Sequence, residues 1–451
     1  MLLSQTGPAV QILYDLEERP PVKRTLVYSF QWLIFTLANS AVVPLVVGTA
    51  LGLDQQGIAD LAQRILFFSA LASLLQVLFG HRLPIIEGPS GMWWGVFITL
   101  SVLAPGIGKP LSVLRTDLEA GLLAAGLVMV LVGASGLMSF ALKLFTPAVT
   151  GSVLVLLGLQ LSGTFVAGML GVGASGSYID IKSVVVSIIV VLVVFWVTLK
   201  GPGFLRSIAI LAGIMVGWAI SVPLGLTGTG QWENSHVLRV PEVFAWGTPT
   251  IDAGVLFTSV VTGLLVLSNL VASILAMEKT IGRELPGKVY NRGVIFTGVA
   301  DIMAGLGSTV GFVPYSAGAG MVSLTGVASR LPFIIFTVAM MILGLVPPVG
   351  IFLSSIPAPV GYSVLLASFA QMMGFGIRDY LKLKLDTRDF FVVGFSVLFG
   401  AGVMFLPPGV YSGVPVVVRY ILGNGFITGM ILVIVLEHII LPRSRFGRMN
   451  T

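Results

Sequence analysis

The chain has 451 residues, of which 56% are hydrophobic and only 10% are charged, and its mean hydropathy is +1.01. These values exclude an ordinary soluble domain and indicate a polytopic membrane protein. The sequence contains no cysteine, which excludes disulfides and thiolate metal sites. We attribute the formal net charge of +6 to membrane topology and expect no nucleic-acid partner.

Apolar runs long enough to cross a bilayer predict an all-α protein with fourteen membrane spans. Residues 1–24 are polar and mixed in charge, so we expect no cleavable signal peptide. The predicted spans cover residues 26–50, 61–80, 84–104, 119–140, 146–168, 183–199, 205–226, 254–276, 291–311, 313–327, 331–349, 357–375, 389–406 and 419–441.

Lys and Arg are distributed unevenly around these spans. With fourteen spans and a cytoplasmic N-terminus, most of the 25 basic residues fall in cytoplasmic loops, as positive-inside topology requires. We therefore expect a multi-pass protein of the plasma (inner) membrane with both termini in the cytoplasm. The basic residues left on the outer side are Arg64, Lys109, Arg115, Lys182, Arg239 and Arg419.

Two predicted spans, the third and the tenth, contain backbone that cannot be helical throughout. Pro84–Gly91 and Gly311–Gly320 combine glycine and proline with polar side chains. Irregular backbone at membrane depth survives only where other helices bury it or where it lines a watery cavity. We expect Pro84–Gly91 and Val313–Gly318 to be extended and to lie side by side. The alternative is that both segments are simple kinks.

The two breaks occupy matching positions in the chain. A long polar loop from about Thr227 to Ile251 divides the spans into seven and seven, and each break lies in the third span of its half. An odd number of spans per half predicts inverted repeats, an arrangement typical of secondary transporters. The half-helices that begin near Gly91 and Gly318 would then direct their partially positive ends at one cavity.

Few polar side chains fall within the spans, and such residues are usually functional. Glu87 is the carboxylate of the first break; it either accepts hydrogen bonds from substrate and carries a proton, or pairs with Arg82 or caps backbone N–H groups. Asn269, which follows Ser268 in the eighth span, offers a donor and an acceptor to a heterocycle. The alternative for Asn269 is a hydrogen bond between helices.

Other intramembrane residues are weaker candidates. Trp93, which follows the first break, would either stack on a planar substrate or face lipid or pack against other helices, and Tyr315 in the second break has the same alternatives. Asp301 in the ninth span would serve in a proton relay or in a buried hydrogen bond. We expect Asn39 and Gln160 to join helices. We find no phosphate-binding loop, no His/Glu metal spacing and no catalytic triad, so we expect neither an enzyme nor a cofactor.

Several motifs resemble those of the nucleobase–ascorbate transporter family, also called nucleobase:cation symporter-2, and the likeness runs through nearly the whole chain. The pattern is similar to a divergent branch of purine permeases within that family. The motifs that carry the resemblance are Leu144–Gly151 with Gly158 in the fifth span, Ile356–Val360 at the twelfth, Phe30-Gln31, Gly88 with Ser90, Gly320 with Thr325, Ser329 and Arg330, and Asn424-Gly425.

The resemblance implies short antiparallel strands in spans 3 and 10, a substrate bound between a core and a gate domain, and a homodimer through the gate domain. The implied divisions are an N-terminal cytoplasmic segment at 1–25, the core domain at 26–140 (spans 1–4) and 251–350 (spans 8–11), the gate domain at 141–250 (spans 5–7) and 351–441 (spans 12–14), and a cytoplasmic tail at 442–451.

The chain departs from the family pattern at the site. Members usually place one Glu in the eighth span and another, followed by Asn, in the tenth. The eighth-span Glu falls on Asn269, or on Ser268 if the register is shifted by one. The tenth-span Glu falls on Ala317 and the following Asn on Gly318. The His that often follows the first-span Gln is Trp32 here. The resemblance therefore implies the fold of the family, whereas the two carboxylates usual at its site are absent from this chain.

From these observations we expect a secondary active transporter, a proton symporter, that imports a purine-type nucleobase such as xanthine or urate. The alternatives are an anion transporter of sulfate-permease architecture and an uncoupled channel or facilitator. Proton coupling is assigned to Glu87 and Asp301. The expected substrate-binding residues are Glu87, Gly88, Ser90, Trp93, Ser268, Asn269, Tyr315, Ala317 and Gly318.

Overall fold

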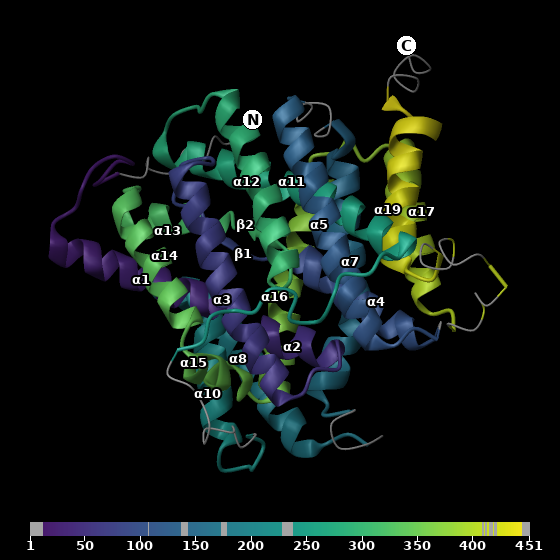
Figure 1. Ribbon diagram of the computed structural model, residues 1–451. Helices are drawn as coiled ribbons and strands as arrows, with labels where there is room; N and C mark the ends of the chain where they lie inside the picture. Colours follow the sequence, from purple (N-terminus) through teal and green to yellow (C-terminus); the bar gives the residue numbers. More distant parts are fainter. Residues whose placement is uncertain are drawn as a thin grey trace.

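The computed structural model describes residues 12–106, 108–136, 143–172, 178–227, 238–407, 410, 413–414, 418 and 422–443 (Figure 1). The first half of the chain contains α1 (Val22–Ser40), α2 (Val43–Ala50), α3 (Gln55–Leu78), β1 (Glu87–Pro89), α4 (Gly91–Gly106), α5 (Leu111–Ser135), α7 (Pro147–Met169), α8 (Ile181–Lys200), α9 (Phe204–Ser207) and α10 (Ala209–Ser221).

The second half contains α11 (Ala253–Ile281), α12 (Gly287–Leu306), β2 (Phe312–Pro314), α13 (Ala317–Thr325), α14 (Arg330–Gly344), α15 (Pro347–Ser354), α16 (Ala358–Tyr380), α17 (Thr387–Met404), α19 (Gly425–Val435) and the π-helical turn η2 (Leu436–Ile440). Side chains that accept a hydrogen bond from the first turn start several of these helices, as N-caps do; they are Asp54, Thr146, Asp180, Asp252, Asp386 and Asn424.

Within the described residues, eight helices are long and apolar enough to cross a membrane, and a bent pair raises the number to nine. That pair is α14 and α15, which meet at an angle of 83°. Pro347 and Pro348 explain the bend, because proline cannot continue a helix through its preceding turn. The expected breaks in the third and tenth spans are present, and the first, seventh and eleventh predicted segments are interrupted as well.

The broken segments meet as predicted. β1 pairs with β2 in antiparallel register, with Glu87 opposite Pro314, Gly88 opposite Val313 and Pro89 opposite Phe312. Figure 1 shows the pair at the centre of the molecule, enclosed by helices. The extended backbone is shorter than predicted, because α13 already begins at Ala317.

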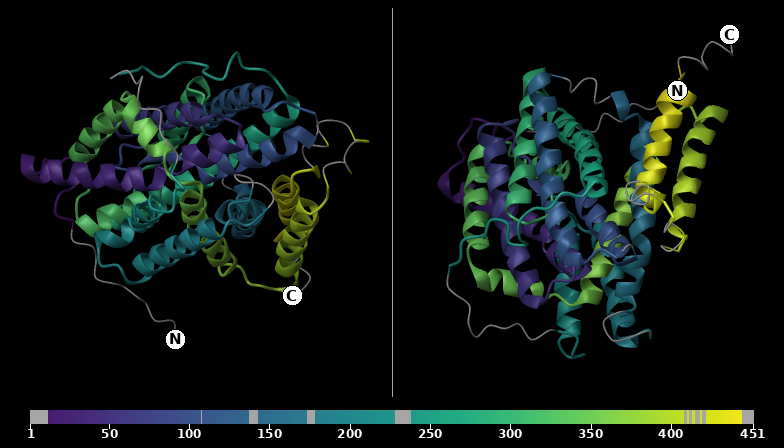
Figure 2. Two further views of the ribbon diagram at one scale, coloured as in Figure 1. Left: turned by 90° about the horizontal axis from the view of Figure 1, so that it is seen from below. Right: turned by 45° about the vertical axis from the view of Figure 1, so that its right-hand side comes forward.

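The helices pack in two groups. The first helix group consists of α1–α5, the strands and α11–α15, with α5 lying along both α11 and α12 and α3 along both α14 and α15. The second helix group consists of α7–α10, α16, α17, α19 and η2, with α16 against α7 and α8. Figure 2 shows α17 and α19 side by side at one flank of the molecule.

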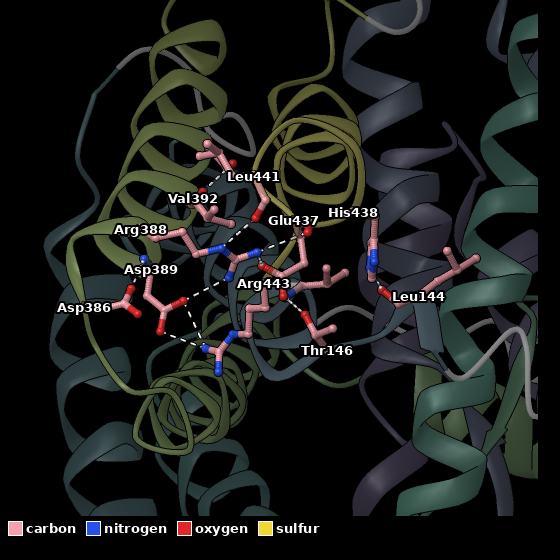
Figure 3. A network of polar contacts seen from close by, with 12 residues as sticks. Leu144, Thr146, Asp386, Arg388, Asp389, Val392, Glu437, His438, Leu441 and Arg443 are labelled. Carbon is pink, nitrogen blue, oxygen red and sulfur yellow. Dashed lines mark hydrogen bonds and ion pairs between the residues drawn. The ribbon is translucent and has the colours of Figure 1, made fainter. Parts of the chain in front are cut away.

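A buried ionic cluster joins the last helices of the second group (Figure 3). The side chain of Arg388 is 2% exposed and lies 2.9 Å from Asp389 Oδ1 and 2.6 Å from Glu437 Oε2. Arg443 lies 2.8 Å from the second carboxylate oxygen of Asp389. Arg388 also donates to the carbonyl of Leu441 at 2.8 Å. These mutual pairings satisfy charges that would otherwise be costly to bury.

Part of the long polar loop forms an ordered strap over the first helix group. Its backbone N–H groups at Arg239, Phe244 and Thr250 donate to carbonyls of Leu345, Leu306 and Thr116. Near one end of the strap, a hydrogen bond from Arg239 holds the pKa of Glu242 below its usual range. The strap therefore connects α5 with the C-terminal ends of α12 and α14.

Candidate functional site

The β1–β2 pair is a two-stranded sheet buried among helices, so its outer edges need hydrogen-bond partners. Serine side chains supply them. Ser73 Oγ accepts from the N–H of Glu87 at 2.9 Å, and Ser69 Oγ donates to the carbonyl of Glu87. On the other strand, Ser273 Oγ donates to the carbonyl of Pro314 at 2.7 Å. The helices α3 and α11 thus hold the strands in place through side chains.

Glu87 is fully buried, and its side chain points toward α3 and α12. Its Oε1 accepts from Gln76 Nε2 at 2.6 Å and from Thr297 Oγ1 at 2.9 Å. The pairing with Arg82 that was one of the alternatives is absent, since Glu87 makes no salt bridge within the described residues. The second oxygen, Oε2, is buried and has no hydrogen-bond partner among the described residues.

Asp301 connects β2 to the half-helix α4. Its Oδ1 accepts from the N–H of Phe312 at 2.9 Å, and its Oδ2 accepts from Trp93 Nε1 at 3.2 Å. Both Asp301 and Trp93 are fully buried. Asp301 therefore makes the buried hydrogen bonds that were one of its two alternatives, and the indole of Trp93 packs inside the first helix group.

Tyr315 covers the strand pair from the other side. Its hydroxyl donates to the carbonyl of Pro89 at 2.9 Å, and a Cβ added at Gly88 would lie 2.3–2.5 Å from its ring. Glycine at position 88 is thus required by the close approach of the ring. Ser90 is fully buried, and its hydroxyl has no hydrogen-bond partner among the described residues.

The first turn of α13 contains Ala317 and Gly318. Ala317 is exposed, whereas Gly318 is buried, and a Cβ added at Gly318 would lie 3.3 Å from the carbonyl oxygen of Pro84 and 3.7 Å from the ring of Trp32. The position of the usual tenth-span carboxylate therefore lies on an accessible surface at the start of a half-helix.

A cavity of about 310 Å³ lies between the two helix groups, with walls from α4, α7, α11 and α16. Ser268 and Asn269 line it from α11, and Met92 lines it from the first turn of α4. Ser268 donates to the carbonyl of Leu265 at 2.7 Å, while the Asn269 amide has no hydrogen-bond partner among the described residues. The lining is otherwise mainly apolar, as is typical of small-molecule sites.

The structure thus divides the predicted site residues into two sets. Ser268 and Asn269 line the cavity. The remaining residues belong to the strand pair and the half-helices beside it and do not line this cavity; they are Glu87, Gly88, Ser90, Trp93, Tyr315, Ala317, Gly318 and Asp301.

Three polar residues of the cavity were not predicted from the sequence. Thr150 lies within the fifth-span motif, in which proline and glycine are the distinctive residues, and Asp379 and Lys382 resemble ordinary loop charges after the twelfth span. Asn39 donates to the carbonyl of Phe35 in its own helix, and Gln160 Oε1 accepts from the N–H of Phe426 across helices. Of these two, Gln160 joins helices as expected.

An aromatic contact crosses the boundary between the two helix groups. The ring centroids of Trp94 in α4 and Phe369 in α16 are 4.7 Å apart, and Phe165 in α7 lies 5.1 Å from Phe369. Within the described part of the chain, no cluster of three or more His, Cys, Asp or Glu could hold a metal ion.

The chain is similar in sequence to known permeases over nearly its full length. The chain is 28% identical over 423 residues to the putative purine permease YwdJ of Bacillus subtilis, covering 92% of this chain and 96% of that protein. It is 25% identical to the uric acid permease PucK of Bacillus subtilis, covering 94% and 96% of the two chains, and 26% identical to the xanthine permease XanQ of Escherichia coli strain K12, covering 96% and 94%.

Solved structures show the same fold at low identity. The transmembrane domain of the cyanobacterial bicarbonate transporter BicA matches with a TM-score of 0.61 and 14% identity, covering 91% of this chain and 98% of that one. The murine Slc26a9 anion transporter in its inward-facing state matches with a TM-score of 0.62 and 12% identity, covering 93% and 69%.

The family model described as "Permease family" (Xan_ur_permease) matches residues 23–409, which is most of the chain. Together with the full-length relatives, this match means that the protein is a membrane transporter and not an enzyme. The chain belongs to the xanthine/uracil-type permease family.

Proposed function

We propose that the protein is a secondary active transporter that imports a purine-type nucleobase, such as xanthine or urate, together with a proton. The observation that carries this proposal is the cavity of about 310 Å³ between the two helix groups, into which Asn269 offers an unpaired amide. A carboxamide supplies both donors and an acceptor, which match the alternating N–H and C=O groups along the edge of an oxidised purine. The relatives named as xanthine and uric acid permeases support this substrate class.

The proposed architecture has fourteen spans in two inverted repeats of seven. The antiparallel pairing of β1 with β2, from matching positions of the two halves, supports it. We propose that the first helix group is the core domain, from 26–140 and 251–350, and that the second is the gate domain, from 141–250 and 351–441. Movement of one group against the other would expose the cavity to each side of the membrane in turn.

In this proposal Ser268 and Asn269 contact the substrate directly. The strand pair supports the cavity wall without lining it, because Met92, the neighbour of Trp93 in the chain, forms part of that wall at the start of α4. The partially positive N-terminus of that half-helix favours an electron-rich or anionic ligand. We include Glu87, Gly88, Ser90, Trp93, Tyr315, Ala317 and Gly318 in the extended site and propose that Glu87 and Asp301 serve proton coupling.

We further propose that the transporter works as a homodimer in the plasma (inner) membrane with both termini in the cytoplasm. Apolar side chains exposed on α17, including Phe391 at 63% and Leu398 at 75%, support a surface that faces lipid or a second copy.

An uptake-competition panel tests the proposed function. Cells that express the protein are given radiolabelled xanthine, with unlabelled purines, pyrimidines, ascorbate, sulfate and bicarbonate as competitors. We expect competition by purines and accumulation against the gradient. Competition by sulfate or bicarbonate alone would favour the anion-transporter alternative, and equilibration without accumulation would favour a channel or facilitator.

A pair of variants tests the site itself. We expect Asn269→Ala to raise KM about tenfold or more, because buried polar groups of the substrate lose their partner. Asn39→Ala is the matched control, since the Asn39 amide bonds within its own helix and does not line the cavity. Unchanged uptake and affinity in both Asn269→Ala and Gly318→Val, at normal membrane abundance, would place the site elsewhere.

A further inference from the structure

The polar residues of the cavity are distributed unevenly between its walls. The α11 wall contributes Ser268 and Asn269, which are uncharged. The opposite wall, from α7 and the end of α16, contributes Thr150, Asp379 and Lys382. Within the described lining, both charged groups therefore come from α16 and the segment that directly follows it.

The two charged side chains differ in how firmly they are held. Asp379 Oδ2 accepts from Thr150 Oγ1 at 2.8 Å, and the Asp379 side chain is 19% exposed. The ammonium of Lys382 pairs with Asp379 Oδ1, but the Lys382 side chain is 64% exposed. Exposed ion pairs contribute little net stability, and a lysine stem has several freely rotating bonds. The pair therefore leaves the ammonium of Lys382 accessible to a second anionic partner.

We propose that Lys382 is a specificity-determining residue that selects the monoanionic form of a purine at the mouth of the cavity. The inference rests on the proposed function, since it names the charge state of the transported base. Asp379 holds the ammonium beside the cavity and keeps the lining neutral overall, so that entry of a monoanion is not opposed. An uncharged purine gains nothing from Lys382 and depends on Ser268 and Asn269.

Uptake of two purines at neutral pH tests the inference. Urate is then a monoanion, whereas hypoxanthine is uncharged. For Lys382→Gln we expect KM for urate to rise roughly tenfold, the scale of one lost charge-assisted contact, with KM for hypoxanthine unchanged. Lys382→Arg should retain urate affinity to within about threefold, since the positive charge remains. Lys384→Gln is the matched control: Lys384 is exposed on the same segment but does not line the cavity.

The outcomes separate the inference from the function on which it rests. Equal changes for urate and hypoxanthine in Lys382→Gln, or no change for either, would overturn the inference and leave the transporter intact. Wild-type uptake of hypoxanthine without urate would do the same. Absence of wild-type uptake for urate, hypoxanthine and xanthine alike, with normal membrane abundance, would overturn both. A rise in urate KM that is equally large in Lys384→Gln would assign the effect to general surface charge and refute a role for Lys382.

Discussion

At the scale of single residues, Glu87 combines burial with incomplete hydrogen bonding. One oxygen accepts from Gln76 and Thr297, and the other has no partner among the described residues. Burying a carboxylate with one oxygen that accepts no hydrogen bond is unfavourable, and protonation of that oxygen lowers the free-energy cost of burial. This arrangement suits a group that gains and loses a proton during transport, although Glu87 faces away from the cavity.

We therefore expect Glu87→Gln to keep substrate exchange but to lose accumulation driven by a pH gradient. The amide keeps an oxygen acceptor for Gln76 and Thr297, so the strand should hold its place, while the titratable proton is gone. Counterflow and proton-driven uptake in proteoliposomes distinguish the two activities. Glu119→Gln is a control, because Glu119 is also a buried carboxyl of the first helix group. Normal pH-driven accumulation by Glu87→Gln would refute the role, and Asp301 would be tested next.

Gly88 is the second residue whose environment makes a sharp prediction. A methyl group at this position would lie 2.3–2.5 Å from the ring of Tyr315, so the ring must move or the strands must separate. We expect Gly88→Ala to lower stability by about 1–3 kcal/mol, measured by thermal unfolding in detergent. Adding Tyr315→Ala should recover part of the loss. Gly320→Ala, where nothing lies within 4 Å, should leave the melting temperature unchanged; equal effects at both glycines would contradict the steric account.

At the scale of secondary structure, the broken spans depend on side chains from intact helices. The strand pair is too short to be stable alone, and serines of α3 and α11 complete its edges. Asp301 then joins β2 to α4 by accepting from both Phe312 and Trp93. The two halves of the chain are thereby fastened at the point where their helices are interrupted.

This fastening predicts coupling between Asp301 and Trp93. We expect Asp301→Asn to destabilise the protein by about 1–3 kcal/mol, because an amide N–H₂ group would face one of the two buried donors. Trp93→Phe should cost less in the Asp301→Asn background than in the wild type, since part of the same interaction is already lost. A double-mutant cycle of melting temperatures measures this; strictly additive effects would mean that the indole–carboxylate contact contributes nothing.

At the scale of the whole molecule, the two helix groups meet at the cavity and at the aromatic contact between Trp94 and Phe369. Alternating access requires relative movement at this boundary. Because the chain contains no cysteine, engineered cysteine pairs can be cross-linked without background reaction.

We expect a cross-link between Trp94→Cys and Phe369→Cys, whose native rings lie 4.7 Å apart across the boundary, to abolish uptake. The pair Phe79→Cys and Phe296→Cys is the control, because those rings lie 6.3 Å apart within one helix group, at the C-cap of α3 and on α12. Uptake is measured before and after a bifunctional thiol reagent and after its reversal. Full uptake with the first pair cross-linked would exclude movement at this boundary.

The amino-acid sequence by itself determined the class of the protein and the places where its helices break. Apolar runs of membrane length predict helices, because every backbone N–H and C=O group must be hydrogen-bonded within lipid and a helix achieves this inside one segment. Proline and glycine at Pro84–Gly91 and Gly311–Gly320 predicted interrupted, extended backbone, because proline breaks a helix and glycine disfavours one. Local composition also identified Ser268 and Asn269, which stand out as polar groups in an apolar span.

Only the tertiary structure decided which polar residues share a cavity. Pairing with Arg82 was one alternative for Glu87, but packing directs its side chain toward Gln76 and Thr297. Thr150, Asp379 and Lys382 come from distant segments, and no local pattern relates them to Asn269. Intramembrane breaks follow from backbone chemistry, which is local, whereas the walls of a cavity follow from how whole helices pack, which depends on contacts far apart in the sequence.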